Sequence, residues 1–335
     1  MLGLTSQTTA NLADYRRQWE ELLLPAPSHL DARPSRLVEV TGFEPAPGNL
    51  RMLSYVPADL PRGAPLVVVL HGCTQTAAGY DHGAGWSALA DRLGFALLLP
   101  EQQRVNNPNS CFTWFAPEDS ERGRGEPLSI RRMIGRMVLD HGLDRRRVYI
   151  TGLSAGGAMT SVMLAAYPEL FAGGAILAGL PYRCAVDLPQ ALRCMAEGRS
   201  RPATDWGGLV RAASPHRGPW PRVSVWHGAA DRTVRPLNAE EIVKQWTDVH
   251  GLGPVPSLVD NVHGCPHRVW CDDAGQAVVE AYLVPGMGHG VPVHPGGGGD
   301  AEARGGTAAP FMLDVGISST WHIARFWGLA EPGLA

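Results

Sequence analysis

Short apolar runs alternate with helical segments along most of the chain, and this alternation leaves few possible folds. The run Leu66 to Leu70 in "APLVVVLHG" is continuous, which is typical of a strand buried on both faces. Further strands are expected in "GFALLLPEQ", "RRVYITG", "GGAILAG", "RVSVWHG" and "AVVEAYLV", with helices at about 80–93, 128–143, 157–168, 237–251 and 319–329. Such alternation predicts the α/β class, a mostly parallel sheet with helices on both faces.

The ends and interruptions of this pattern predict the domain organisation. Residues 1–35 combine helical spacing at 11–24 with several prolines, so we expect a helical and Pro-rich extension followed by a single domain at 36–330. "RLVEVTGF" and "LRMLSYVP" are expected to pair antiparallel at a sheet edge. The segment Tyr182 to Pro221 interrupts the alternation. It is interpreted either as an insertion near the substrate site or as a long surface excursion. His294 to Gly306 has the composition of a mobile surface loop.

The charge and hydropathy of the chain exclude two classes of partner. The formal net charge of −3 gives no basic footprint for nucleic acid, and no apolar run approaches the ~18 residues of a membrane span. No obvious protein partner is indicated. The first residues lack the basic and apolar regions of a signal peptide.

Six cysteines bear on the compartment, and 15 pairings are possible. The short gaps favour Cys184–Cys194 and Cys265–Cys271 as local disulfides. "HGC" and "NSC" each follow a central strand, so we also expect a Cys73–Cys111 disulfide on one rim of the sheet. Paired cysteines favour an extracellular or periplasmic protein, and free thiols in a cytoplasmic protein are the alternative.

Ser154 lies in "VYITGLSAGGAM", between a predicted strand and a predicted helix. In this context G-x-S-x-G forms a sharp turn, in which glycines avoid Cβ clashes and the hydroxyl projects above the sheet. The following helix offers N–H groups and its positive dipole end to a developing oxyanion. We therefore predict that Ser154 is a nucleophile rather than the N-cap of an ordinary turn.

A serine nucleophile needs a base and a residue that orients the base. After such an elbow, the acid follows a later strand and the histidine comes last in the chain. Asp231 in "RVSVWHGAADRTV" and His289 in "AYLVPGMGHG" occupy these places, so Asp231 would bind Nδ1–H of His289 and leave Nε2 facing Ser154. Candidates that fit this order less well are His227, His294, Asp187, Asp205 and Asp248.

Two backbone N–H groups are expected to form an oxyanion hole. Ala155 directly follows the nucleophile, and Cys73 lies in the loop "LHGCTQT" after an early strand. The alternative for the second loop is an ordinary turn at a strand end. Trp114, in "NSCFTWFAPE", lies where cleft walls form and is a candidate substrate contact.

Neither a metal nor a cofactor is indicated by the remaining motifs. The cluster "VHGCPHRVWC" has C-x-H-x3-C spacing, which matches no common structural zinc site, so a loop disulfide is the preferred interpretation. The glycine-rich stretches "GYDHGAG" and "GGGGD" lack the spacing of phosphate-binding loops.

At these motifs the sequence resembles the poly(3-hydroxybutyrate) depolymerase family of esterases, which shares features with feruloyl and acetylxylan esterases. The similarity lies in "HGCTQT", "NSCFTWF", "GLSAGGAM", "VWHGAADRTV", "GMGHG" and "ISSTWHIARFW", and spans about residues 36–327. It implies an α/β-hydrolase fold over the catalytic domain 36–330, ester hydrolysis without a cofactor, and a triad of Ser154, Asp231 and His289.

Three functions are compatible with these observations. The first is hydrolysis of short-chain 3-hydroxybutyrate esters or oligomers through an acyl-enzyme, with a small-molecule or oligomeric ester as substrate. The second is a feruloyl or acetylxylan-type carbohydrate esterase with the same chemistry. The third is a non-catalytic binding protein on a hydrolase scaffold, against which the intact Ser, Asp, His order argues.

Overall fold

The computed structural model describes residues 34–42, 46–296 and 305–330 of the chain. Within this part, ten strands form one mixed sheet. Its spatial order is β1 (Val38–Glu39), β2 (Arg51–Tyr55), β4 (Ala96–Glu101), β3 (Leu66–Leu70), β5 (Val148–Leu153), β6 (Gly173–Leu177), β7 (Arg222–Gly228), β10 (Ala277–Val284), β9 (Cys265–Cys271) and β8 (Leu258–Val262). The six strands from β4 to β10 in this order are parallel, and two antiparallel strands lie at each edge. This topology confirms the predicted α/β class.

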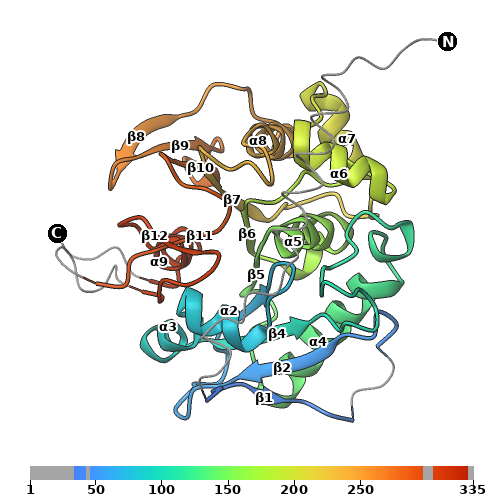
Figure 1. The fold of residues 1–335 in the computed structure, drawn as a ribbon, viewed down its shortest axis with the longest axis vertical. Helices are drawn as coiled ribbons and strands as arrows, with labels where there is room; N and C mark the ends of the chain where they lie inside the picture. Colours follow the sequence, from blue (N-terminus) through green and yellow to red (C-terminus); the bar gives the residue numbers. More distant parts are fainter. Residues whose placement is uncertain (1–33, 43–45, 297–304, 331–335) are drawn as a thin grey trace.

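Helices cover both faces of the sheet (Figure 1). One face carries α2 (Ala77–Ala84), α3 (Trp86–Leu93) and α9 (Ser319–Phe326), and the other carries α4 (Gly125–His141), α5 (Ala155–Ala166), α6 (Leu188–Glu197), α7 (Ala203–Ala212) and α8 (Leu237–Val249). Two short 3-10 helices, η1 (Pro117–Asp119) and η2 (Pro168–Leu170), and a parallel pair, β11 (Val291–Val293) and β12 (Met312–Asp314), complete the structure.

Strand β3 shows why a continuous apolar run is needed at the centre of this sheet. Leu66, Val68 and Leu70 belong to the core beneath α4 and α5, whereas Val67 and Val69 belong to the core beneath α2 and α3. All five side chains are buried. Burying each contributes about 1.5–3 kcal/mol, so a polar residue at any of these positions would weaken one of the two cores.

The register of the parallel strands brings several loops to one edge of the sheet. Pairs of aligned residues near the carboxyl ends are Leu70 with Gly152, Leu153 with Leu177, Leu177 with Trp226, and His227 with Leu283. The loops after β3, β5, β7 and β10 therefore open on the same side. In open α/β sheets this edge is where ligands bind.

The predicted antiparallel edge pair, β1 with β2, is confirmed. Two expectations differ from the structure. The helix expected at 80–93 is divided at Gly85, whose left-handed backbone ends α2 and whose added Cβ would lie 2.8 Å from the backbone nitrogen of Gly306. The loop expected around residues 263–271 is instead a hairpin, because His263 and Gly264 both have positive φ and form a tight turn between β8 and β9.

Other expectations concern the insertion and the N-terminal extension. The insertion at 182–221 folds into α6 and α7, which pack beside α8 and α5. The helix expected at 11–24 and most of the loop at 294–306 lie outside the described residues. In the described ranges, no helix has the length and apolar character that crossing a membrane requires.

Candidate active site

Ser154 occupies a strained turn between β5 and α5. Its backbone has φ 57° and ψ −118°, a conformation that side-chain-bearing residues rarely adopt and that costs on the order of 1–3 kcal/mol. The turn is held by a hydrogen bond from Ser154 N–H to the carbonyl of Leu177, at 2.9 Å. Ser154 thus lies at the carboxyl edge of the sheet, as predicted for a nucleophile elbow.

The glycines on either side of Ser154 are required by close backbone contacts. A Cβ on Gly152 would lie 2.4 Å from the carbonyl oxygen of Gly156, and one on Gly156 would lie 2.4 Å from the carbonyl oxygen of Leu70. Either substitution would push α5 away from β3 and β5. The spacing of the motif therefore has a packing cause in this structure.

Asp231 and His289 form a hydrogen-bonded pair on two neighbouring loops. Asp231 follows β7, His289 lies between β10 and β11, and His289 Nδ1 donates to Asp231 Oδ2 at 2.7 Å. The other oxygen, Oδ1, accepts from the N–H groups of Thr233 and Val234. Burial opposes ionisation of Asp231, but the charge and hydrogen bond of His289 outweigh it and lower the pKa of the carboxyl.

The Nε2 atom of His289 makes no hydrogen bond with another described residue. Ser154 and the Asp231–His289 pair thus share the carboxyl edge of the sheet without a hydrogen bond between Ser154 and His289. Such bonds are often long in free enzymes and tighten when substrate is bound. The structure therefore joins two of the three predicted triad residues directly and places the third on the same edge.

His227, a competitor for the base, lies behind Asp231. Its Nε2 donates to the carbonyl of Val234 at 2.7 Å and is 3.5 Å from Asp231 Oδ2. The side chain is fully buried, and this desolvation lowers its pKa, so the ring is neutral. His227 therefore supports the Asp231 loop from the protein interior and cannot reach a substrate.

Phe311 is a neighbour of His289 that sequence reasoning missed. Its ring meets the His289 ring edge-on, with centroids 6.3 Å apart and planes at 81°, and its own backbone has φ 63°. The carbonyl of Phe311 accepts from Val291 N–H at the start of β11. Only the pairing of β11 with β12 brings residue 311 to the site, and no local sequence pattern indicates that pairing.

The two predicted oxyanion donors follow β3 and β5 at the carboxyl edge of the sheet. Ala155 is the first residue of α5, and Cys73 lies three residues after the end of β3. Neither N–H group donates to another residue in the described part of the chain. The predicted Cys73–Cys111 disulfide is confirmed and ties the Cys73 loop to the loop that carries Trp114.

Trp114 is largely buried, with 7% of its surface exposed, and its ring packs edge-on against Phe115. It belongs to the core on the α4 and α5 side of the sheet. The Trp114 side chain is therefore part of the core, and its contact with substrate remains a prediction.

The other two predicted disulfides are absent, and all four cysteines are free thiols. Cys265 and Cys271 are the two ends of β9, so extended backbone holds them about 20 Å apart. Cys194 lies near Cys184, but its thiol donates to the Cys184 carbonyl at 3.0 Å instead of forming a bond between sulfurs. Closeness in sequence was therefore a poor guide to pairing.

His267, in the segment "VHGCPHRVWC", has two carboxylate partners. His267 binds Asp260 through Nδ1 at 2.8 Å and Glu280 through Nε2 at 3.2 Å. Among the residues with described positions, no three His, Cys, Asp or Glu side chains converge in a way that could hold a metal ion.

Comparisons with known proteins point to one enzyme family. The family model "Esterase PHB depolymerase" matches residues 52–256, which include Cys73, Ser154 and Asp231. The chain is 46% identical over 314 residues to poly(3-hydroxyalkanoate) depolymerase C from Paucimonas lemoignei, covering 92% of this chain and 75% of that protein. It is 33% identical over 269 residues to feruloyl esterase B from Neurospora crassa, covering 77% and 89% respectively.

A solved structure gives the same indication. The acetyl xylan esterase from Aspergillus awamori superimposes with a TM-score of 0.74 at 26% sequence identity, covering 88% of this chain and 99% of that one. The similarity in sequence and in fold therefore extends over most of the chain.

Proposed function

Because the chain belongs to the esterase PHB depolymerase family, and is thereby a carboxylic ester hydrolase, we propose that it cleaves short-chain 3-hydroxyalkanoate esters and oligomers. Ser154 is the nucleophile, His289 the base and Asp231 the residue that orients the base. The observation that carries this proposal is the Asp231–His289 hydrogen bond of 2.7 Å on the same sheet edge as the Ser154 elbow.

Acylation uses Nε2 of His289, which has no partner among the described residues. Ser154 Oγ attacks the ester carbonyl carbon while His289 Nε2 takes the hydroxyl proton, and the ionised Asp231 stabilises the resulting imidazolium. The carbonyl oxygen becomes an oxyanion, which accepts from the N–H groups of Ala155 and Cys73. The tetrahedral intermediate then expels the alcohol, which takes the proton from His289, and Ser154 is left acylated.

Deacylation repeats these steps with water. His289 Nε2 removes a proton from water as the water oxygen attacks the acyl carbon, and the same two N–H groups bind the second oxyanion. Ser154 leaves with the proton from His289, and the free acid departs. The cycle needs no electron transfer and regenerates the starting enzyme.

The choice of acyl group rests on similarity and on the surroundings of the site. The relative with 46% identity is named for poly(3-hydroxyalkanoate), whereas the feruloyl esterase is 33% identical. Phe311, which lies beside His289, and the Cys73–Cys111 disulfide are apolar groups on the loops at this edge. An apolar rim suits an aliphatic ester with few charged groups.

The domain boundaries and the compartment belong to the same proposal. We assign catalysis to a single domain at 36–330, preceded by an extension at 1–35. The Cys73–Cys111 disulfide fits an oxidising compartment. We therefore place the enzyme outside the cell or in the periplasm.

A fluorophosphonate probe and an ester panel test the proposal. The probe should label Ser154, and Ser154→Ala should lose labelling and all but a weak residual turnover of p-nitrophenyl butyrate. Near-native activity in a folded Ser154→Ala variant would exclude the assignment. A kcat/KM for methyl ferulate at least about tenfold above that for a hydroxybutyrate trimer, about 1.4 kcal/mol in transition-state binding, would instead identify a feruloyl esterase.

A further inference from the structure

A pair of carboxyl groups shares one hydroxyl beneath the loop that carries Cys111 and Trp114. Glu126, in the first turn of α4, is 2% exposed. The Thr113 hydroxyl oxygen is 2.8 Å from Glu126 Oε1 and 2.5 Å from Asp119 Oδ2 at the end of η1. Asp119 Oδ1 also accepts from the backbone N–H of Glu126 at 2.8 Å.

Both short contacts of the Thr113 hydroxyl can be hydrogen bonds only if the cluster holds an additional proton. The hydroxyl has a single proton, so it can donate to only one of the two carboxyl groups. If it donates to Asp119, the other short contact must be a bond donated by a protonated Glu126 to the Thr113 oxygen. Burial and the negative charge of Asp119 outweigh the hydrogen bonds from Thr113 and Gln102 and raise the pKa of Glu126 to about 8, which favours Glu126 as the carboxyl that holds the proton.

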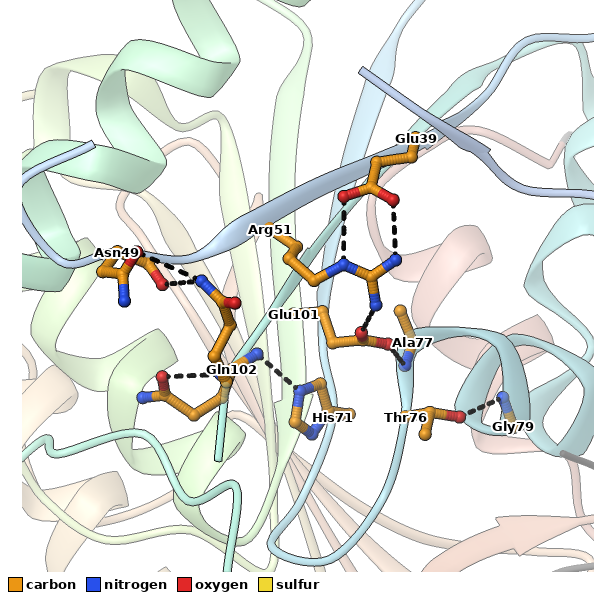
Figure 2. A network of polar contacts seen from close by, with 10 residues as sticks. Glu39, Asn49, Arg51, His71, Thr76, Ala77, Gly79, Glu101 and Gln102 are labelled. Atoms are coloured by element: carbon orange, nitrogen blue, oxygen red, sulfur yellow. Dashed lines mark hydrogen bonds and ion pairs between the residues drawn. The ribbon is translucent and has the colours of Figure 1, made fainter. Parts of the chain in front are cut away.

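Among the described residues, the charged groups around this cluster do not offset the negative charge of an ionised Glu126. Asp119 faces it from η1, and the adjacent His71 is a fully buried ring whose desolvation lowers its pKa. At the end of β4, Glu101 is paired with Arg51 and also accepts from Ala77 N–H, so both its oxygens have partners (Figure 2). Among the described residues, no arginine or lysine binds the Glu126 carboxyl.

Gln102 connects Glu126 with the loop that carries Cys73. The Gln102 side-chain amide donates to Glu126 Oε1 at 2.5 Å and to the carbonyl of Cys111 at 3.2 Å. Its backbone N–H donates to His71 Nε2 at 3.0 Å, as Figure 2 shows. This acceptor role leaves the proton on His71 Nδ1, which donates to the Gly72 carbonyl at 2.8 Å.

Two further bonds join the same loops. The Cys73–Cys111 disulfide links them covalently, and Thr74 N–H donates to the carbonyl of Asn109 at 2.7 Å. The position of the Cys73 N–H therefore depends on the loop at 102–116. That loop in turn is held against α4 by the contacts of Thr113 and Gln102 with Glu126.

We propose that Glu126 is a positioning residue for ester hydrolysis. It holds the Cys73 N–H in place by donating a hydrogen bond to Thr113 and accepting one from Gln102. The inference rests on the proposed function, because the Cys73 N–H matters only if Ser154 generates an oxyanion. Loss of the proton leaves two negative carboxylates on one hydroxyl, and the loop must shift. A displacement of about 1 Å at a catalytic group can cost about 10²-fold in rate.

The pH profile of kcat/KM tests this proposal, with p-nitrophenyl butyrate as substrate. For the wild type, kcat/KM should fall about fivefold or more between pH 7.5 and 9.5, because Glu126 ionises over this range. Glu126→Gln retains a donor toward Thr113 at every pH but loses the bond from Gln102. It should therefore be about two- to fivefold slower at pH 7 and show no alkaline loss. Glu118→Gln, on exposed η1, should follow the wild type.

The outcomes separate this inference from the proposed function. If folded Glu126→Gln loses as much kcat/KM at alkaline pH as the wild type, the inference is overturned. It is also overturned if the variant has a lower melting temperature but an unchanged pH profile of kcat/KM. If that variant does not fold, infrared spectra of the wild type decide. The band of a protonated carboxyl must disappear together with kcat/KM, and a band that persists through the loss refutes the inference. Failure of the fluorophosphonate to label Ser154 would instead refute the proposed function.

Discussion

Two histidines in the described part of the molecule bind an aspartate through Nδ1, His289 with Asp231 at 2.7 Å and His267 with Asp260 at 2.8 Å. The second ring nitrogens of the two histidines differ in their partners. Nε2 of His267 contacts Glu280 at 3.2 Å, whereas Nε2 of His289 has no partner among the described residues. A base needs a free nitrogen, so the two pairs are suited to different roles despite equal hydrogen bonds.

The rings of the two histidines also pack differently. His267 lies flat on Tyr282, with centroids 4.1 Å apart and planes at 20°, and Tyr282 lies flat on Trp226. His289 and Phe311 instead form a T-shaped pair, with centroids 6.3 Å apart and planes at 81°. Stacking fixes His267 within the sheet, whereas His289 lies on a loop between β10 and β11. An Asp–His distance therefore does not by itself identify a catalytic pair.

The largest expected effect separates the two aspartates. Asp231→Asn should lower kcat about 10³- to 10⁴-fold, because the amide donates to His289 Nδ1 and leaves the proton on Nε2, where it prevents base catalysis. Asp260→Asn makes the same chemical change at the other pair and should keep kcat within about twofold. Steady-state kinetics with p-nitrophenyl butyrate would measure both, and similar losses in the two variants would contradict the division of roles.

Stability should respond in the opposite way. His267→Ala leaves the buried carboxylate of Glu280 with Ser224 as its remaining side-chain donor, at 2.6 Å. Removing one member of a buried ion pair costs about 3 kcal/mol, so urea unfolding should show a loss of this order while fluorophosphonate labelling of Ser154 persists. The control is His263→Ala, an exposed histidine in the adjacent turn, which should change stability by less than about 0.5 kcal/mol.

The contribution of His267 to stability should also depend on pH. Burial opposes charge on the ring, but the hydrogen bonds and charges of Glu280 and Asp260 outweigh it and raise the pKa of His267. A raised histidine pKa adds stability that is complete below about pH 6.5, the unfolded value, and is lost as pH rises through the folded value. The difference in unfolding free energy between wild type and His267→Ala should therefore be larger near pH 6 than near pH 9. A difference that grows with pH would show that His267 is neutral.

The contrast between the pairs also shows what the sequence could predict. Chain order and loop position were enough to select Asp231 and His289, because both follow recognisable strands. The hairpin that holds His267 was missed, since its strands mix polar and apolar residues and its turn is His263–Gly264. Glu126 was missed as well, because it is buried by a loop that folds over α4 and helical periodicity does not report such a contact.

The smallest effect concerns the ring beside His289. Phe311→Ala removes the edge-on contact, and Phe311→Leu keeps apolar volume without an aromatic ring. An aromatic contact contributes about 0.5–1.5 kcal/mol, so kcat/KM for p-nitrophenyl butyrate should fall about two- to tenfold in both variants. A loss mainly in kcat would indicate that Phe311 orients the imidazole, and a rise mainly in KM would indicate contact with the acyl chain. If neither constant changed in either variant, the free nitrogen of His289 would be held by its bond to Asp231 alone, and the packing difference between the two histidines would have no part in catalysis.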